Sequence, residues 1–420
     1  MELRRLMFIS VSLLCVVGAL AVSAQRSDSS DWPQWRGTNR DGISRETGLL
    51  TRWPEDGPRS VWTARDLGEG FSSIAVSGGR IFGMGYRDGQ EAVWALKESD
   101  GSGLWLTPVG KPLNPDPGGR GPGPRGTPTV DGDRVYTLGV NGQLACLNAA
   151  NGRLIWRRDL MADYGGRVPS WGYCESPLID GNKVIATPGG RSATIVALDK
   201  MSGKEIWRTR TPGRDPAHYS SCIAADVDGQ RQYIQFLRSG VVGVAASDGR
   251  FLWSYARPAN GTANCATPIY RDNHIFAASA YGTGGGCARL TTDQYGKVSV
   301  TELYFTRRMQ NHHGGLVLAG DFIYGFDGSN LTCLNFKTGQ EMWHDRSVGK
   351  GSVIFADGYI YARSERGPVA LIEATPAGYV EKGRFAQPER SRYSTWAYPV
   401  IAGGRLYLRD QGNLFSYALK

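Results

Sequence analysis

Short apolar runs separated by glycine-containing turns repeat along the chain from residue 58 to the C-terminus. In the clearest units an apolar run is followed by a turn and a second short run that ends in tryptophan. The turns contain Asn-Gly, Ser-Gly, Asp-Gly or Thr-Gly pairs, which favour tight hairpins. These tryptophans are Trp105, Trp156, Trp207, Trp253 and Trp343. Each unit therefore predicts a hairpin whose last strand carries a large aromatic side chain that packs against a neighbour.

A second hairpin precedes the first in each unit. It reads Thr-Pro-Thr-Val-Asp-Gly-Asp-Arg-Val-Tyr at residues 127–136 and Ser-Pro-Leu-Ile-Asp-Gly-Asn-Lys-Val-Ile at residues 176–185. Two hairpins make a four-stranded unit, and a period of roughly 40 to 50 residues with four strands is typical of propeller blades. The pattern predicts an all-β, eight-bladed β-propeller of four-stranded antiparallel blades, counted from Trp62.

The two ends of the repeat region complement each other. The chain finishes in a half-repeat at residues 413–419, and residues 58–66 offer an unpaired outer strand. We expect strands from both ends to close the last blade, because ring closure buries the faces of the blades against one another and protects the sheet edges. Weaker units end near Tyr304 and Phe385 without tryptophan. Since the unit around Tyr304 is irregular, a seven-bladed ring is the alternative.

Residues 1–24 have the pattern of a secretory signal peptide, with Arg4 and Arg5 before an apolar run that ends in Val-Ser-Ala. We expect cleavage after Ala24 and a periplasmic or secreted protein; an uncleaved membrane anchor is the alternative. No later stretch is apolar enough to span a membrane. Residues 25–57 are not repeat-like and are expected to pack on the outside of the ring, and residues 58–420 form the propeller domain.

Composition narrows the class of partner. The formal charge is +9, but it is spread along the chain without a run of five basic residues, so nucleic-acid binding is not predicted. The six cysteines after the signal peptide include no adjacent pair and no CxxC motif, so neither a redox motif nor a zinc site is indicated. Their disulfide connectivity is not readable. Cys146 and Cys333 stand in the middle of strands, where a thiol usually acts as a small core residue.

The repeat resembles a known family. Residues 197–207 read Ala-Leu-Asp-Lys-Met-Ser-Gly-Lys-Glu-Ile-Trp, which is similar to the pyrroloquinoline-quinone (PQQ) type of propeller repeat. Further similar segments are Asp-Trp-Pro-Gln-Trp-Arg-Gly at residues 31–37, Trp-Gly-Tyr at 171–173 and Asn-His-His-Gly-Gly at 311–315. This superfamily contains quinoprotein alcohol dehydrogenases and the outer-membrane barrel-assembly lipoprotein, and the likeness covers nearly the whole mature chain.

The resemblance implies the fold more firmly than the chemistry. Quinoprotein dehydrogenases usually carry an adjacent cysteine pair over the quinone, an aspartate base, and glutamate and asparagine ligands to calcium. This sequence has no adjacent cysteine pair, and the base and calcium ligands cannot be mapped onto it. We therefore assign no catalytic residue and no cofactor, PQQ with calcium being the group that the resemblance implies.

The centre of the ring is the place where a propeller of this kind would bind a ligand, because loops at the start of each innermost strand meet there. Compared blade by blade, the residues at this position are chemically diverse, as a ligand site requires and repeat packing does not. The candidates for a site at the channel mouth are Phe71, Arg125, Glu175, His312, His313, Lys350 and Trp396. The alternative is that these residues solvate a water-filled channel mouth.

Each candidate suggests a role. Arg125, His313 and Lys350 suit an anionic or sugar-like group, Glu175 could pair with one of them, and an aromatic residue could stack on the ligand. His312 and His313 are adjacent, so on a strand they would point to opposite faces, and no metal site is predicted. Residues 114–126, rich in proline and glycine, should form a loop over the same rim, either as a lid or as an ordered structural coil.

Two functions follow from different classes. The first is a non-catalytic binding or scaffolding module of the bacterial envelope, a monomer whose partners are envelope proteins or a small polar ligand. The second is a divergent quinoprotein-type oxidoreductase acting on an alcohol or sugar. The missing cysteine pair favours the first, and we expect that the protein is not an enzyme.

Overall fold

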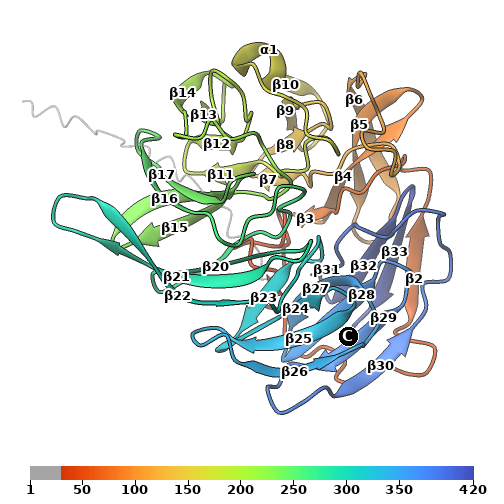
Figure 1. Ribbon diagram of the computed structural model, residues 1–420. Coiled ribbons are helices and arrows are strands. Elements are labelled where there is room, and N and C mark those ends of the chain that lie inside the picture. Colours follow the sequence, from red (N-terminus) through yellow and green to blue (C-terminus); the bar gives the residue numbers. More distant parts are fainter. Residues whose placement is uncertain (1–29) are drawn as a thin grey trace, which may run out of the picture.

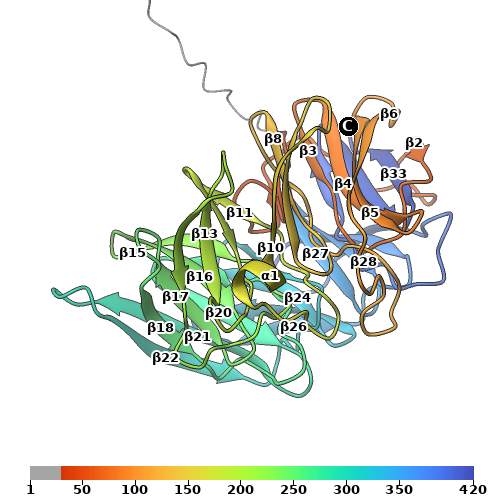
Figure 2. The same ribbon diagram turned by 90° about the horizontal axis from the view of Figure 1, so that it is seen from above.

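A computed structural model describes residues 30–420 and places eight antiparallel sheets in a ring, as the blades of a propeller (Figures 1 and 2). The predicted fold class and the count of eight blades are confirmed. The predicted signal peptide, residues 1–24, lies outside the described residues. Within residues 30–420 no helix has the length and apolar character needed to cross a membrane.

The first four blades follow one another along the chain, each with its strands in sequence order across the sheet. Blades one and two are β3 (Ala75–Ser77), β4 (Arg80–Arg87), β5 (Gln90–Lys97), β6 (Gly103–Gly110), and β7 (Thr129–Asp131), β8 (Arg134–Leu138), β9 (Gln143–Asn148), β10 (Leu154–Asp159). Blades three and four are β11 (Leu178–Asp180), β12 (Lys183–Ala186), β13 (Ile195–Asp199), β14 (Glu205–Thr209), and β15 (Ile223–Val227), β16 (Gln230–Phe236), β17 (Val241–Ala245), β18 (Phe251–Tyr255). One short helix, α1 (Leu160–Tyr164), follows β10.

The remaining four blades complete the ring, and two of them receive a strand from the N-terminal part of the chain. Blades five and six are β19 (Ile269–Arg271), β20 (His274–Ser279), β21 (Gly284–Thr292), β22 (Val298–Thr306), and β23 (Leu316–Ala319), β24 (Phe322–Asp327), β25 (Asn330–Asn335), β26 (Glu341–Asp345). Blade seven is β27 (Gly351–Ala356), β28 (Tyr359–Ser364), β29 (Val369–Glu373), β30 (Glu381–Phe385), joined by β1 (Ile43–Ser44). Blade eight is β31 (Val400–Ala402), β32 (Arg405–Asp410), β33 (Asn413–Ala418) and β2 (Ser60–Ala64).

The middle strands are largely buried because both faces of each blade are covered by neighbouring blades. In β9 the four central residues are all buried, whereas the outer strand β10 has no buried residue. Cys146 and Cys333 are fully buried in β9 and β25, as core residues. This arrangement explains why the sequence shows short apolar runs rather than the alternation of a sheet with one solvated face.

The repeated tryptophan and glycine join consecutive blades. The Trp156 indole nitrogen donates to the carbonyl oxygen of Lys200 in the next blade at 3.0 Å. The same ring lies against Gly203, where an added Cβ would stand 2.8 Å from it. Trp105 repeats this contact on Gly152, with the indole donating to Ala149 at 3.1 Å. The glycine is needed because the aromatic ring of the preceding blade occupies the space of its side chain.

The ring closes as the sequence predicted. Strand β2 pairs in antiparallel fashion with β33, so the first and last strands of the repeat region share blade eight. Trp62 of β2 then makes the usual contact with blade one, since its ring packs on Gly101 and its indole donates to Glu98 at 3.3 Å. The aromatic contact between neighbouring blades therefore also joins the last blade to the first.

The sequence predicted that the N-terminal segment packs on the outside of the ring. The structure shows that part of it lies near the axis instead. Trp32 and Val76 exchange backbone hydrogen bonds of 2.9 and 2.8 Å at blade one. Arg40 donates to the carbonyl oxygens of Ser176 and Pro177 at blade three, and Trp35 donates to Thr267 at blade five. Residues 30–44 therefore cross the ring near its axis, and they provide part of the floor of the central cavity. Trp53, packed on Phe385 and Tyr361 of blade seven, lies away from the axis.

Candidate functional site

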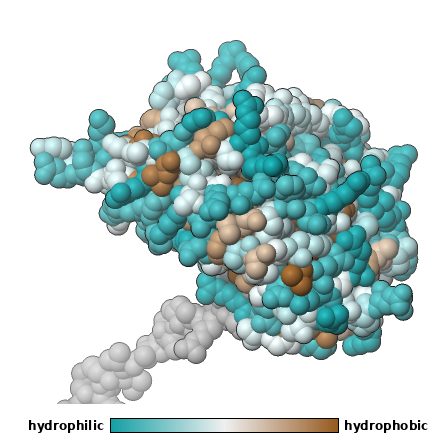
Figure 3. Space-filling view, turned by 60° about the horizontal axis from the view of Figure 1, so that its bottom comes forward, coloured by the Kyte–Doolittle hydropathy of each residue, from teal (hydrophilic) through white to brown (hydrophobic). Residues whose placement is uncertain are grey.

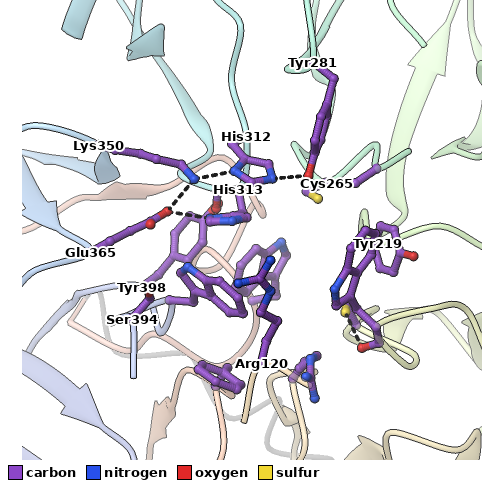
Figure 4. A pocket seen from close by; sticks show the side chains of 17 residues that line it. Arg120, Tyr219, Cys265, Tyr281, His312, His313, Lys350, Glu365, Ser394 and Tyr398 are labelled. Carbon is purple, nitrogen blue, oxygen red and sulfur yellow. Dashed lines mark hydrogen bonds and ion pairs between the residues drawn. The ribbon is translucent and has the colours of Figure 1, made fainter. Parts of the chain in front are cut away.

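A cavity of about 350 Å³ lies at the centre of the ring, where the loops leading into the innermost strands meet (Figure 4). Aromatic side chains from four parts of the chain form most of its wall: Trp35, Phe71, Trp171, Trp396 and Tyr398. The charged residues of the wall are Arg120, Arg125, Lys350 and Glu365. The site therefore combines flat apolar surfaces with an excess of cations.

Six of the seven residues proposed from the sequence lie in the wall of this cavity: Phe71, Arg125, His312, His313, Lys350 and Trp396. They come from five different blades or the loops between them, and the structure brings them together because each precedes an innermost strand. Phe71 and Trp396 face each other with ring centroids 4.8 Å apart. Whether they bind a ligand stays a prediction, which is developed below.

Arg125 has a structural task within the wall. Its guanidinium donates to the carbonyl oxygens of Gly123 at 2.8 Å and Gly121 at 3.2 Å, and it lies 5.2 Å from the centre of the Phe71 ring. Burial lowers its pKa, although a guanidinium stays charged at neutral pH. Arg125 thus holds the loop that carries it and is less free to bind an anion than the sequence suggested.

The loop of residues 114–126 is an ordered coil over the rim. The Asp116 carboxylate accepts from the backbone N–H groups of Arg120 and Gly121 at 2.9 Å, and Gly123 donates to Pro115 at 2.8 Å. These bonds favour the structural coil over a mobile lid. They also present Arg120 at the mouth, where its side chain extends into the cavity (Figure 4).

A chain of polar side chains crosses one side of the cavity (Figure 4). The Tyr281 hydroxyl lies 2.7 Å from His312 Nε2, and the Lys350 ammonium contacts His312 Nδ1. Lys350 Nζ lies 3.2 Å and His313 Nδ1 lies 3.0 Å from the same oxygen of Glu365. Burial would raise the pKa of Glu365, but His313 and Lys350 overcome that effect and hold it at about 2. Burial, with His313 and Lys350 beside it, lowers the pKa of His312 to about 3, so this ring is neutral at pH 7.

The two histidines point into the same cavity, and the strand-based reason against a metal is therefore wrong. Residues 307–315 form a loop between β22 and β23, not a strand. The imidazole rings lie 3.9 Å apart at an angle of 31°. The Asn311 side chain fixes the loop by donating to Gly315 and Phe326, each at 3.1 Å. Alternation of side chains applies only to extended backbone, and these residues lie in a loop.

Glu175 does not pair with a cation of the cavity. Its side chain is buried between blades, where it accepts from the backbone N–H of Thr187 at 2.7 Å and from the Thr187 hydroxyl at 2.9 Å. The Gln235 amide also donates to it at 2.9 Å. Burial raises the pKa of Glu175 to about 7, despite these bonds and the charge of Arg40. The residue links blades three and four and is not a ligand group.

This raised pKa predicts a pH dependence of stability. Between pH about 4.5 and 7 the native state keeps a proton that the unfolded chain has released, so the free energy of unfolding falls as pH rises. Glu175→Gln should remove this part of the slope, on the order of 2–3 kcal/mol over that interval. Urea unfolding of both proteins at several pH values between 4.5 and 8 measures it. Glu91, whose pKa burial also raises to about 7, remains in both proteins. An unchanged slope in the variant would contradict the assignment.

The cysteines of the cavity are unpaired. Cys174 and Cys265 line the wall from blades three and five, and all six cysteines of residues 30–420 are free thiols. Burial raises the pKa of Cys174 to about 11 despite the nearby Arg125, and burial also raises that of Cys265. Both are therefore neutral thiols at pH 7 and weak nucleophiles.

Sequence reasoning did not propose Trp35, Arg120, Tyr281 and Glu365 for the site. Trp35 lies in a segment, residues 31–37, whose similarity to the family gave no hint of its position. Arg120 lies in a loop whose path does not follow from any sequence pattern. Glu365 follows β28 and lies beside Lys350 at the end of the β27–β28 ladder, where its backbone N–H donates to the Lys350 carbonyl oxygen at 2.9 Å. The residues missed are thus those outside the repeated start of the innermost strands.

Comparison with known proteins relates this chain to one family of envelope propellers. The family model described as "Outer membrane protein assembly factor BamB" matches residues 89–345, more than half of the chain. The BamB of Kangiella koreensis is 27% identical over 219 residues, which cover 50% of this chain and 49% of that protein. A tetrathionate hydrolase of Acidithiobacillus ferrooxidans is 23% identical over 288 residues, covering 69% of this chain and 48% of the hydrolase. The matched regions span about half the length of these curated relatives.

Solved structures share the ring. BamB from Moraxella catarrhalis superposes with a TM-score of 0.60 at 18% identity, covering 86% of this chain and 97% of that one. The quinohemoprotein alcohol dehydrogenase from Comamonas testosteroni has a TM-score of 0.65 at 12% identity, covering 93% and 80%. At these identities the likeness shows the fold alone, a propeller of the PQQ-repeat type.

Proposed function

This chain belongs to the family of the outer membrane protein assembly factor BamB, and from that premise we propose that it is a non-catalytic binding module of the bacterial envelope. Its central cavity would hold a small anionic, sugar-like ligand. The name of the family, an outer membrane protein assembly factor, supports an envelope location, and so does the signal peptide pattern of residues 1–24.

The observation that carries the proposal is the make-up of the cavity wall. Flat aromatic rings on several sides suit a sugar ring. Arg120 and Lys350 bring positive charge, whereas Glu365 is the one carboxylate of the wall and is already in contact with Lys350. Among residues 30–420, no carboxylate lies within 4.0 Å of the Arg120 guanidinium, since Asp116 contacts only the backbone N–H of this residue. An exposed, unpaired guanidinium facing aromatic walls favours a ligand with a carboxylate or phosphate group.

A fluorescence titration tests this ligand class. Trp35, Trp171 and Trp396 line the cavity, so a bound ligand should change tryptophan emission. We expect saturable binding of glucuronate and much weaker binding of glucose, which has the same ring without the charge. Arg120→Ala should weaken glucuronate binding about tenfold, and Arg153→Ala, an exposed arginine on a distant turn, should not. If neither glucuronate nor a phosphorylated sugar binds at millimolar concentration, the ligand proposal fails.

Scaffolding of envelope proteins is the other part of the proposal. The matching family and the relative from Kangiella koreensis are assembly factors by name, which supports protein partners. The face seen in Figure 3 is mainly hydrophilic, with small and scattered apolar spots. Exposed Leu104 and Leu106 lie two residues apart on the outer strand of blade one, so together they form only a small apolar spot. A pull-down from envelope extract tests this part, which fails if no envelope protein is recovered in a defined ratio.

A calcium-bound quinone does not fit the residues present. Calcium takes six to eight oxygen ligands, whereas the cavity wall provides one carboxylate, that of Glu365, which already contacts His313 and Lys350. The Glu175 carboxylate is used by Thr187 and Gln235. Cys174 and Cys265 come from different blades and are unpaired. We therefore derive no reaction step through a quinone.

A further inference from the structure

Three potential metal ligands converge on one side of the cavity. His312 and His313 come from the loop between β22 and β23, and Glu365 follows β28 in the next blade. One ligand atom of each residue lies within 4.8 Å of the others. The three side chains are partly buried, so they are shielded but still open to the cavity. Two blades thus direct two imidazoles and a carboxylate at the same small volume (Figure 4).

The backbone holds these ligands in place. The Tyr398 hydroxyl donates to the carbonyl oxygen of His313 at 2.5 Å, and Val353 of β27 donates to that of Gly314 at 3.1 Å. Trp396 packs against His313 with ring centroids 4.8 Å apart. A site whose ligands are fixed before the ion arrives loses less conformational entropy on binding.

One ligand-to-ligand distance is close to that of a tetrahedral ion, and the third ligand atom lies within 4.8 Å of the other two. Bonds of about 2.0–2.2 Å to nitrogen and oxygen place neighbouring ligand atoms about 3.3 Å apart. His313 Nδ1 and Glu365 Oε1 are 3.0 Å apart. That carboxylate oxygen is buried, and none of its close neighbours is aligned for a well-formed hydrogen bond. A buried carboxylate oxygen beside two imidazoles favours a cation, and a metal ion could take the position that the Lys350 ammonium now shares.

A cation already occupies part of this space. The Lys350 ammonium contacts His312 Nδ1 and lies 3.2 Å from the same Glu365 oxygen. Its side chain is 33% exposed, so it can turn toward solvent without crossing packed residues. If His312 Nδ1 binds an ion instead, its Nε2–H still donates to the Tyr281 hydroxyl, 2.7 Å away, and this outer contact orients the ring.

We propose that His312, His313 and Glu365 form a binding site for a divalent transition-metal ion of the zinc class, and that the Lys350 ammonium takes the place of the ion when it is absent. Two imidazoles and one carboxylate suit zinc or cobalt, whereas calcium and magnesium require mainly oxygen ligands. Three protein ligands leave one position that faces the cavity, where water or a ligand anion can bind. The metal site goes beyond the proposed function and does not depend on it.

Metal titration of the full mature chain tests the site. After chelator treatment and dialysis, Co2+ is added and its visible absorption is followed, with Zn2+ measured by calorimetry. We expect one ion per chain. His313→Ala and Glu365→Gln should each weaken binding at least about tenfold, because each removes a ligand. His344→Ala is the matched control: His344 Nδ1 also lies 2.7 Å from a glutamate, Glu341, but on the surface and with no second histidine.

Lys350→Leu tests the competition. Removing the ammonium leaves the three ligands without a competing cation, so Co2+ should bind about tenfold more tightly than in the wild type. Thermal melting checks that each variant is folded. The site is refuted if the wild type binds no ion at millimolar metal, or if His313→Ala and Glu365→Gln bind as the wild type does. Equal affinity in Lys350→Leu would refute the role of the ammonium. Because the probe is the metal alone, neither result depends on the sugar titration.

Discussion

Replacing Arg409 by methionine should lower the free energy of unfolding by about 3–5 kcal/mol. Arg409 lies on β32 of blade eight and is 1% exposed. Its guanidinium donates to the carbonyl oxygens of Gln411 at 3.0 Å, Ser72 at 2.9 Å and Gly68 at 3.3 Å. Gly68 and Ser72 precede the first strand of blade one, so this side chain joins the last blade to the first.

The expected loss has a specific physical origin. Methionine fills a similar volume but donates no hydrogen bond, so three carbonyl oxygens would remain buried without their donor. The guanidinium also lies over the Trp94 ring, 5.5 Å from its centre, and this contact would be lost as well. Because a ring is only closed when its last blade meets the first, the weakened contact lies where no repeat neighbour can replace it.

Arg405→Met is the matched control. Arg405 lies on the same strand and also reaches blade one, donating to Glu98 at 2.7 Å and Ser99 at 3.1 Å, but it is partly exposed. Water can replace its bonds, so we expect a loss below about 1 kcal/mol. Urea unfolding followed by circular dichroism measures both. Equal losses in the two variants would show that burial of Arg409 is not what matters.

The fold could be predicted because each blade solves the same packing problem with the same residues. Trp156 on Gly203 and Trp105 on Gly152 are two examples of one contact, and a contact that recurs leaves a visible period in the sequence. The closure of blade eight could be predicted for the same reason. Trp62 matches the repeated tryptophan of an outer strand, but the other three strands of its unit are missing from that part of the sequence. Segments that occur once carry no such period, which is why the course of Trp35 near the axis was not foreseen.

The site could be predicted only in part, for a related reason. Alignment of the repeats identifies which residue begins an innermost strand, and this placed His313 and Lys350 at the cavity. It does not identify the direction of the next side chain, so Glu175 was expected at the mouth although it points between blades to Thr187 and Gln235. Nor does it reveal Glu365. This residue faces His313 because blades six and seven are neighbours in the ring, although the two residues lie about fifty positions apart in the sequence.

Gly314→Ala should lower the free energy of unfolding by at least about 4 kcal/mol. A Cβ at this position would overlap the carbonyl oxygen of Gly351 and stand 2.9 Å from its carbonyl carbon. Both atoms belong to the backbone of β27. Gly351 is held in place by the β27–β28 ladder, in which it pairs with Ser364. The backbone dihedral of Gly314 is accessible to alanine, so the effect measures the clash alone.

The same substitution should separate the two halves of the site. Gly314 follows His313 and Gly351 follows Lys350, so pushing these glycines apart moves His313 away from Lys350 and Glu365. In the folded fraction of Gly314→Ala we therefore expect Co2+ binding to be lost, whereas a variant destabilised elsewhere, such as Arg409→Met, should bind it as the wild type does. Gly103→Ala is the control, because nothing lies within 4 Å of an added Cβ there. If Gly314→Ala were destabilised but bound Co2+ normally, the close approach of blades six and seven would be a packing contact that does not position the ligands.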